Sequence, residues 1–202
     1  AEDVQLVVLG TGEGKYQDMF TYYSRKYPER VSANIFYSEA LSHRIYASCD
    51  AFLMPSLFEP CGLSQLMSLR YGTLPIVRET GGLRDTVTPY NEVDGTGTGF
   101  SFTNYNAHEM LAIIRYAKKT YFNDRRAWNE MVLRAMKQDF SWDASAREYE
   151  KLYDGLIEEE ARRKEAIRLQ QAREAAEAAL KEAEKALELA KRAEEKAIRK
   201  FS

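Results

Sequence analysis

The stretch Phe-Glu-Pro-Cys-Gly-Leu-Ser-Gln, residues 58–65, joins a short apolar run to a segment with helical spacing. The run before it, residues 51–54, contains no polar side chain, which is typical of a strand covered on both faces. After it, apolar residues recur at helical spacing until Gly72. We therefore expect a strand-to-helix turn at the carboxyl end of a strand, where open α/β sheets bind their ligands.

This turn has the residues that a phosphate group requires. The backbone N–H groups of Gly62, Leu63 and Ser64 would be free at the start of the helix, where anions bind. A connecting loop in which Glu59 caps the helix would explain the same spacing. Spacing alone does not decide between these two interpretations.

Composition limits the classes of protein that this chain can be. Its 202 residues fit one core domain plus an accessory element, and 45% hydrophobic residues can form a proper core. A net charge of -2, with no early basic block, argues against a nucleic-acid partner. Cys49 and Cys61 do not form a disulfide framework, and neither a membrane span nor a signal peptide is recognisable. We expect a soluble, cytoplasmic protein that binds no membrane.

Strands alternate with helices along the first part of the chain, which predicts an α/β fold with a doubly wound parallel sheet. Five strands are expected, at residues 4–9, 31–37, 51–54, 74–77 and 99–102. A second turn, Thr80-Gly81-Gly82, follows the fourth strand and should face the same rim as Glu59. Two glycine-bearing turns on one rim suggest a cradle for a phosphate or a sugar.

Other segments add helices but no metal site. Asn106 followed by Glu109 predicts a capped helix start, and a further helix is expected over residues 124–137. His43 and His108 are interpreted as structural or exposed, because no metal-ligand spacing surrounds them. Neither a metal nor a resident cofactor is expected.

Five stretches together resemble one enzyme family. They are residues 7–12, 37–46, 58–65, 70–83 and 139–142, and they look like the C-terminal domain of bacterial glycogen synthases and plant starch synthases. The resemblance covers about residues 3–156, so that residues 1–157 form the predicted domain. Related sugar transferases keep a second Glu eight positions after the first; Met67 stands there instead, as in this synthase branch.

The resemblance implies a truncated Rossmann-like domain of a GT-B glycosyltransferase that uses ADP-glucose. The parent activity is retaining transfer of glucose to the non-reducing end of an α-1,4-glucan. Glu59 would hold the donor glucose and support the positive charge of the transition state. Residues 62–64 would hold the diphosphate, Thr80, Gly81 and Gly82 would line the sugar and phosphate side, Cys61 would line the pocket, and Tyr37 would stack on adenine.

Two departures from the family predict that this chain by itself is inactive. The acceptor domain does not precede these residues, and neither do the first strand and helix of the nucleotide domain, which supply an arginine and a lysine to the diphosphate. Loss of such cations should cost about 3 kcal/mol or more per contact. ADP or ADP-glucose would therefore bind weakly at most.

The same loss predicts a changed sheet. Without its first strand, the usual order 3-2-1-4-5-6 becomes 2-1-3-4-5, the flavodoxin-like order. The strand at residues 4–9 would then pair directly with the strand at 51–54. A lost covering helix would also leave an apolar groove.

Residues 158–202 predict a long helical extension. The segment consists almost entirely of strong helix formers, and pairs such as Glu177→Lys181 and Glu188→Arg192 have the favourable i,i+4 orientation. Alanines alternate steps of four and three along it: Ala172, Ala176, Ala179, Ala183, Ala186, Ala190, Ala193 and Ala197. This helix could be a solvated single helix, a helix–helix contact surface or a cover for the groove.

Such uniform repetition favours an engineered protein, in which a synthase fragment carries a rigid helix as a scaffold for self-association or a fusion partner. The alternative hypothesis is the ADP-glucose-binding part of a retaining α-1,4-glucan glucosyltransferase.

Overall fold

The computed structural model describes residues 2–201, except the side chains of residues 194, 195 and 197–201. Two compact units divide the chain, Ala1–Asp139 and Phe140–Ser202. The predicted domain boundary at residue 157 was based on the extent of the family resemblance. A division into compact units does not test that boundary, so it stays a prediction. Among residues 2–201, no helix has both the length and the apolar composition needed to cross a bilayer.

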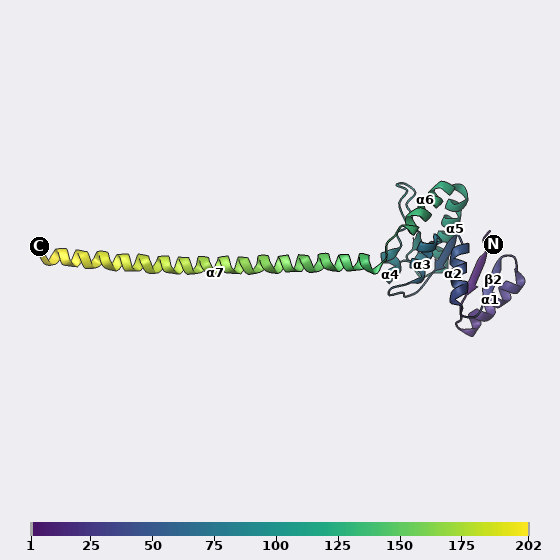
Figure 1. Cartoon of the computed structure of the whole chain (residues 1–202), viewed down its shortest axis with the longest axis horizontal. Coiled ribbons are helices and arrows are strands. Elements are labelled where there is room, and N and C mark those ends of the chain that lie inside the picture. The colour runs from purple at the N-terminus through teal and green to yellow at the C-terminus, as the bar shows by residue number, and fades with distance from the viewer. Residues whose placement is uncertain (1, 202) are drawn as a thin grey trace. The chain divides into compact units, whose positions relative to one another are not determined.

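The first unit is an α/β unit in which strands and helices alternate until β5 (Figure 1). In chain order its elements are β1 (Leu6–Leu9), α1 (Gly14–Lys26), β2 (Val31–Asn34), α2 (Glu39–Ser48), β3 (Ala51–Met54), α3 (Ser64–Tyr71), β4 (Leu74–Arg78), α4 (Gly81–Thr86), β5 (Phe100–Phe102), α5 (Ala107–Asn123) and α6 (Arg125–Met136). The α/β class and the parallel strands are as predicted.

The predicted single five-stranded sheet is wrong. The strands form one sheet of two, in the order β1-β2, and one of three, in the order β3-β4-β5. All pairs are parallel; Leu6 lies opposite Val31, and Ala51 lies opposite Leu74. The expected direct pairing of β1 with β3 is not found in the described part of the chain. The edges of β1 and β3 therefore do not close up as the order 2-1-3-4-5 requires.

The main core lies around the three-stranded sheet. Leu74 and Phe100 of β4 and β5, with 0% and 1% exposure, pack with Leu69 of α3 and with Trp128 and Met131 of α6. By contrast, α1 has no buried residue, and β1 is only partly covered. Burial of apolar surface is the main favourable term in folding, so the three-stranded half carries most of the stability of this unit.

Polar side chains cap the start of three of the helices described in the first unit. The Ser38 hydroxyl accepts a hydrogen bond from the Leu41 N–H, and Asn106 and Asp124 accept from the N–H groups of Glu109 and Ala127. Such caps satisfy N–H groups that the first helical turn leaves unpaired. The capped start at Asn106 was predicted from the sequence and is confirmed.

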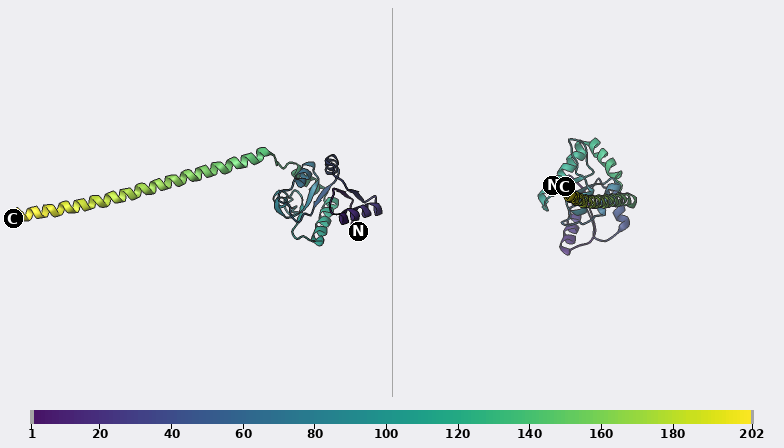
Figure 2. Two further views of the ribbon diagram at one scale, coloured as in Figure 1. Left: turned by 90° about the horizontal axis from the view of Figure 1, so that it is seen from below. Right: turned by 90° about the vertical axis from the view of Figure 1, so that its left-hand side faces the viewer.

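The described residues of the second unit form one helix, α7, over Trp142–Phe201 (Figures 1 and 2). Its 60 residues would span about 90 Å at the normal rise of an α-helix. The predicted pair of Glu188 with Arg192 forms at 2.7 Å, whereas Glu177 pairs with Arg173 at 3.0 Å. The alanines that recur in steps of four and three form a stripe along α7, and each of them from residue 172 to 193 is exposed. The side chain of Ala197 lies outside the described residues.

Candidate functional site

The two predicted turns lie at the same rim of the three-stranded sheet. One turn follows Met54 at the carboxyl end of β3 and leads to α3, which begins at Ser64. The other follows Arg78 at the carboxyl end of β4 and leads to α4. Because β3 and β4 are parallel and adjacent, both turns emerge side by side.

Backbone contact joins these turns directly. The N–H of Gly82 lies 3.2 Å from the carbonyl oxygens of both Glu59 and Pro60. A Cβ atom at Gly82 would lie only 1.8 Å from the carbonyl oxygen of Cys61. The sequence indicated that small residues are needed here for the approach of a ligand. The structure adds that Gly82 must be small for the two turns to approach each other.

The buried side chain of Gln65 stabilises the first turn by hydrogen bonds. Its side chain is fully buried, and its amide nitrogen donates to the carbonyl oxygen of Gly62 at 2.7 Å and to the Thr86 hydroxyl at 3.1 Å. The Thr86 hydroxyl donates in turn to the carbonyl oxygen of Gly82. Gly62 itself has a φ of +72°, a conformation that favours glycine.

Neither Gln65 nor Thr86 was expected to have a role, and α4 was not predicted. A polar residue among the apolar positions of a helix is the one signal that could have pointed to Gln65. Thr86 gave no such signal, because it lies in a different segment of the chain and meets the turn only through the fold.

The start of α3 remains uncapped by any side chain. Its N-cap residue is Leu63, which makes no capping hydrogen bond. The alternative in which Glu59 caps the helix is therefore wrong. The first N–H groups of α3, beginning with Ser64, have no intrahelical partner, because the first bond back along the helix is from Met67 to the carbonyl oxygen of Leu63. An anion can bind at such a helix end.

A basic residue at the end of β4 and the acidic residue after it stabilise the rim. The Arg78 guanidinium donates to the carbonyl oxygen of Ser56 at 2.8 Å and also to that of Leu57. The Glu79 carboxylate accepts from the Ser101 hydroxyl at 2.7 Å and from the Thr103 hydroxyl at 3.3 Å. These contacts hold the segment before Glu59 against the ends of β4 and β5.

The rim is open to solvent. Glu59 and Ser64 are partly buried and Cys61 is exposed, while the side chains of Phe58 and Leu63 are 75% and 62% exposed. Charges at an open site interact through a high effective dielectric constant. The site as it stands can bind an anion but does not exclude water.

Of the predicted site residues, the structure brings together Glu59, Cys61, the N–H groups of residues 62–64 and the turn at residues 80–82. Tyr37 is not joined to them by any hydrogen bond or ring contact in the part of the chain that the structure describes. It follows β2, next to the capping residue Ser38, and its side chain is 85% exposed. Its assignment to adenine stays a prediction.

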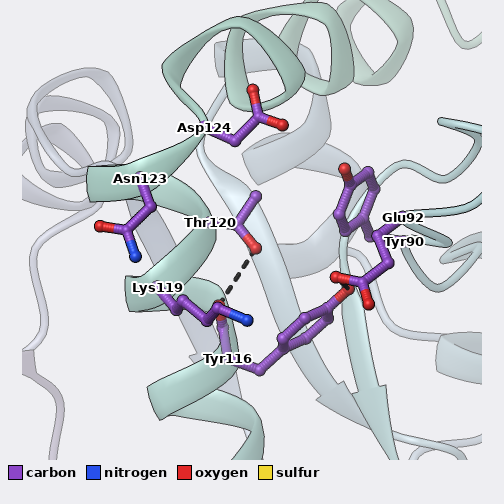
Figure 3. Close-up of a pocket in the computed structure, with 7 residues that line it drawn as sticks. All are labelled: Tyr90, Glu92, Tyr116, Lys119, Thr120, Asn123 and Asp124. Carbon is purple, nitrogen blue, oxygen red and sulfur yellow. Dashed lines mark hydrogen bonds between the residues drawn. The ribbon is translucent and has the colours of Figure 1, made fainter.

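A separate pocket of about 260 Å³ lies between α5 and the segment before β5 (Figure 3). It contains none of the predicted site residues. Tyr116 points toward Glu92 in this pocket, with its hydroxyl 3.5 Å from the carboxylate. Burial and the nearby carboxylates raise the pKa of Tyr90 and Tyr116. Among the side chains that the structure describes, no group of three or more from His, Cys, Asp and Glu is arranged to hold a metal ion.

Comparison with known proteins finds relatives of this chain. A family model described as glycosyl transferases group 1 matches residues 1–132. Glycogen synthases from Lachnospira eligens and Lachnoclostridium phytofermentans are 72% and 67% identical to this chain over 156 residues. Each match covers 77% of this chain and 33% of the relative. The chain therefore spans about a third of the length of the curated relatives it matches.

Among solved structures, one similar chain is the catalytic domain of starch synthase IV from Arabidopsis thaliana, bound to ADP and acarbose. It is 36% identical, with a TM-score of 0.64, and the match covers 74% of this chain and 32% of that one. Sequence and fold thus agree on one family. The chain belongs to the group 1 glycosyltransferases, and its relatives within them include glycogen and starch synthases.

Proposed function

We propose that residues 1–157 are the donor-binding portion of an ADP-glucose-dependent, retaining α-1,4-glucan glucosyltransferase. The observation that carries this proposal is the uncapped start of α3, which lies beside a second glycine turn on the same rim. The diphosphate would accept hydrogen bonds from N–H groups at residues 62–64. A starch synthase of similar fold was solved with ADP, which supports the same nucleotide here.

Glu59 has a distinct role in this proposal. Its carboxylate would accept a hydrogen bond from a hydroxyl of the donor glucose and would favour the positive charge that develops on the sugar ring. Thr80, Gly81 and Gly82 would pass along the sugar and phosphate side, where larger side chains would collide with the donor. Cys61 would line the pocket, and Tyr37 would stack on adenine.

This chain by itself is proposed to transfer no glucose. The exposure of Phe58 and Leu63 leaves the rim accessible to water, which weakens every charge–charge interaction with the donor. Catalysis of glycosyl transfer depends on charges held in a site from which water is excluded. We therefore expect binding in the millimolar range, equivalent to about -4 kcal/mol.

The proposal predicts a specific pattern of donor binding. Titration calorimetry at high ligand concentration should detect weak binding of both ADP and ADP-glucose. Glu59→Gln should weaken ADP-glucose binding and leave ADP binding unchanged, because the carboxylate contacts only the glucose. Gly62→Val should abolish both, since valine is strained at a φ of +72°. Unchanged ADP binding by Gly62→Val would show that the nucleotide binds elsewhere.

A transfer assay separates binding from catalysis. Labelled ADP-glucose and a glycogen primer should give no incorporation with the purified chain. Detectable glucan synthesis would contradict the proposed inactivity, and micromolar affinity for ADP would contradict the expected weak binding. Either result would leave the donor-site assignment in place.

A second candidate role concerns α7. We propose that residues 158–202 are the rigid extension of an engineered scaffold, used for self-association or for a fusion partner. The uninterrupted helix with i,i+4 ion pairs such as Lys164–Glu160 at 3.5 Å supports this role. The glycogen synthase relatives match 152–157 residues of the chain, which is compatible with a tail of separate origin.

A further inference from the structure

The pocket beside α5 lies at the opposite end of the strands from the two rim turns. Tyr90 donates its N–H to the carbonyl oxygen of Gly99 at 2.8 Å, directly before the amino end of β5. Helix α5 begins after the carboxyl end of β5 and packs against β4 and β5, so it ends near the amino ends of these strands. None of the residues assigned to donor binding lines this pocket.

Aromatic side chains form one wall of the pocket. The rings of Tyr90 and Tyr116 are stacked with their centroids 6.2 Å apart, and both meet the ring of Phe100 edge-on. Phe100 is 1% exposed, belongs to the main core and stacks on Trp128. A wall held by the core keeps its shape when a ligand enters, which reduces the entropy lost on binding.

Charged and polar groups around this wall are left available by the fold. Within the part of the chain that the structure describes, Lys119 forms no ion pair and the Asn123 amide forms no side-chain hydrogen bond. One carboxylate oxygen of Asp124 accepts the capping hydrogen bond of α6 at 3.0 Å, which leaves the other oxygen for a ligand. The Glu92 carboxylate lies 3.5 Å from the Tyr116 hydroxyl, beyond the usual length of a hydrogen bond. Polar groups that converge on a partly apolar pocket are typical of a ligand site.

The pocket carries charges of both signs. Burial and then the carboxylates of Asp124 and Glu92 raise the pKa of Tyr90. Burial and Glu92 raise the pKa of Tyr116 in the same way, so both acidic residues act on the aromatic wall. The Lys119 ammonium points into the pocket in Figure 3 and supplies a positive charge. A neutral ligand would remove these charged groups from water without compensation, which is unfavourable.

The volume of the pocket limits the size of its ligand. It is about 260 Å³, below the range of about 300–1,000 Å³ that is typical of sites for drug-sized ligands. A nucleotide sugar or an oligosaccharide is too large for it, whereas a molecule of the size of an amino acid fits.

We propose that this pocket binds a small zwitterion. Its ammonium group lies between the carboxylates of Glu92 and Asp124, and its carboxylate group pairs with Lys119. The hydroxyl oxygens of Tyr90 and Tyr116 can accept further hydrogen bonds from the ammonium group. Each charge of the ligand then meets a charge of opposite sign, which a neutral sugar or a simple anion does not achieve.

NMR titration of the full chain tests this site. The probes are glycine, β-alanine, γ-aminobutyrate and ε-aminocaproate, a series that varies the separation of the two charges. At least one of them should bind with a dissociation constant of about 1 mM or below and shift the amide signals of Glu92, Lys119 and Thr120. The matched amine, in which a methyl group replaces the carboxylate, should bind at least about threefold more weakly. The matched acid without the amino group should not bind.

Two variants assign the two charges of the ligand. Lys119→Met should make the zwitterion bind no better than the matched amine, whereas Lys137→Met, at the other end of α6, should leave their affinity ratio unchanged. Glu92→Gln should weaken the zwitterion and the amine alike, by at least about threefold. Glu92 and Lys119 are exposed, so these substitutions should leave the fold intact.

Several results would overturn the proposal. They are the absence of shifts at these amides with every probe at about 50 mM, shifts confined to residues 58–65, or equal affinity of wild type for the zwitterion and its amine. An unchanged affinity ratio in Lys119→Met would do the same. So would tighter binding of glucose or maltose at the same amides, because a neutral sugar makes no use of the charges.

Discussion

Contacts between single atoms set the spacing of the two rim turns. The N–H of Gly82 reaches the carbonyl oxygens of two residues in the first turn, and the Gln65 amide holds that turn from the inner side. These contacts use backbone carbonyls that would otherwise lack partners. The position of the N–H groups at the start of α3 therefore depends on the contacts that Gly82 and Gln65 make within the protein.

Gly82→Ala should lower the free energy of unfolding. The new Cβ atom would lie 1.8 Å from the carbonyl oxygen of Cys61, so the turns must separate, at a cost of about 1–3 kcal/mol. Urea unfolding measures this difference. Gly12→Ala is the matched control, because nothing lies within 4 Å of the position of its Cβ; it should change stability by less than about 0.5 kcal/mol. Equal effects of the two variants would contradict the steric argument.

The ion pairs of Glu2 with Lys118 and Arg115 predict that the stability of the fold depends on pH. Hydrogen bonds from Lys118 and then Arg115 lower the pKa of Glu2 from 4.5 to about 2. A carboxylate with a lowered pKa contributes stability above its unfolded pKa, and this contribution is lost as the pH falls from 4.5 toward 2. Wild type should thus exceed Glu2→Gln in urea midpoint at about pH 7, and the difference should close toward about pH 2.

The control for this pH effect is Glu13→Gln, which removes an exposed ion pair with Lys15. Exposed pairs contribute little to stability. A difference between wild type and Glu2→Gln that persists unchanged at about pH 2 would mean that the carboxylate acts through packing rather than charge.

At the scale of elements, the two halves of the first unit differ in how well they are covered. β4 is buried along most of its length, between β3 and β5 and under α3 and α6. The β1–α1–β2 segment packs mainly on itself, and α1 buries no residue. Amide exchange should consequently be faster in this segment than in β4.

Within α7, Gly155 is the one glycine. Nothing lies within 4 Å of the position of its Cβ, so Gly155→Ala should stabilise the helix by about 1 kcal/mol. Thermal unfolding followed by circular dichroism at a helical band would measure this gain as a higher midpoint temperature. Gly95→Ala also meets open space, but its φ of +71° makes alanine unfavourable there, so that variant should lose stability. A Gly155→Ala variant no more stable than wild type would mean that this turn is not helical in solution.

At the scale of the whole molecule, exposed apolar side chains on α7 predict self-association. Tyr149, Leu152, Tyr153, Leu156 and Ile157 share one face by their spacing, and their side chains are 52–67% exposed. Contiguous apolar patches of this kind mark interaction surfaces. Sedimentation velocity should therefore show a mass that rises with protein concentration.

Two variants distinguish the possible interfaces of α7. Replacement of both Leu152 and Leu156 by Glu should give a monomer if the large apolar residues form the contact, whereas Ala183→Glu should not. The reverse result would assign the contact to the alanine stripe. A strict monomer at every concentration would refute self-association.

Much of the fold and of the candidate site could be predicted from the sequence. The unbroken apolar run at residues 51–54 and the glycine-bearing turns after β3 and β4 are local patterns, and the structure places both turns on one rim. The second strand ends earlier than predicted, at Asn34, and α4 was missed because two glycines weaken the helical pattern at its start. The contact of Gln65 with Thr86 could not be identified in advance, because the two residues are 21 positions apart in the sequence.

The sequence by itself determined the element types, the rim that carries the turns and the long C-terminal helix, since hydrophobic period and backbone preferences act over a few residues. Only the tertiary structure decided that β1 and β3 do not pair and that Gln65 and Gly82 hold the two turns together. Strand pairing and backbone contact between distant segments depend on how the whole unit packs, and no local pattern encodes that packing.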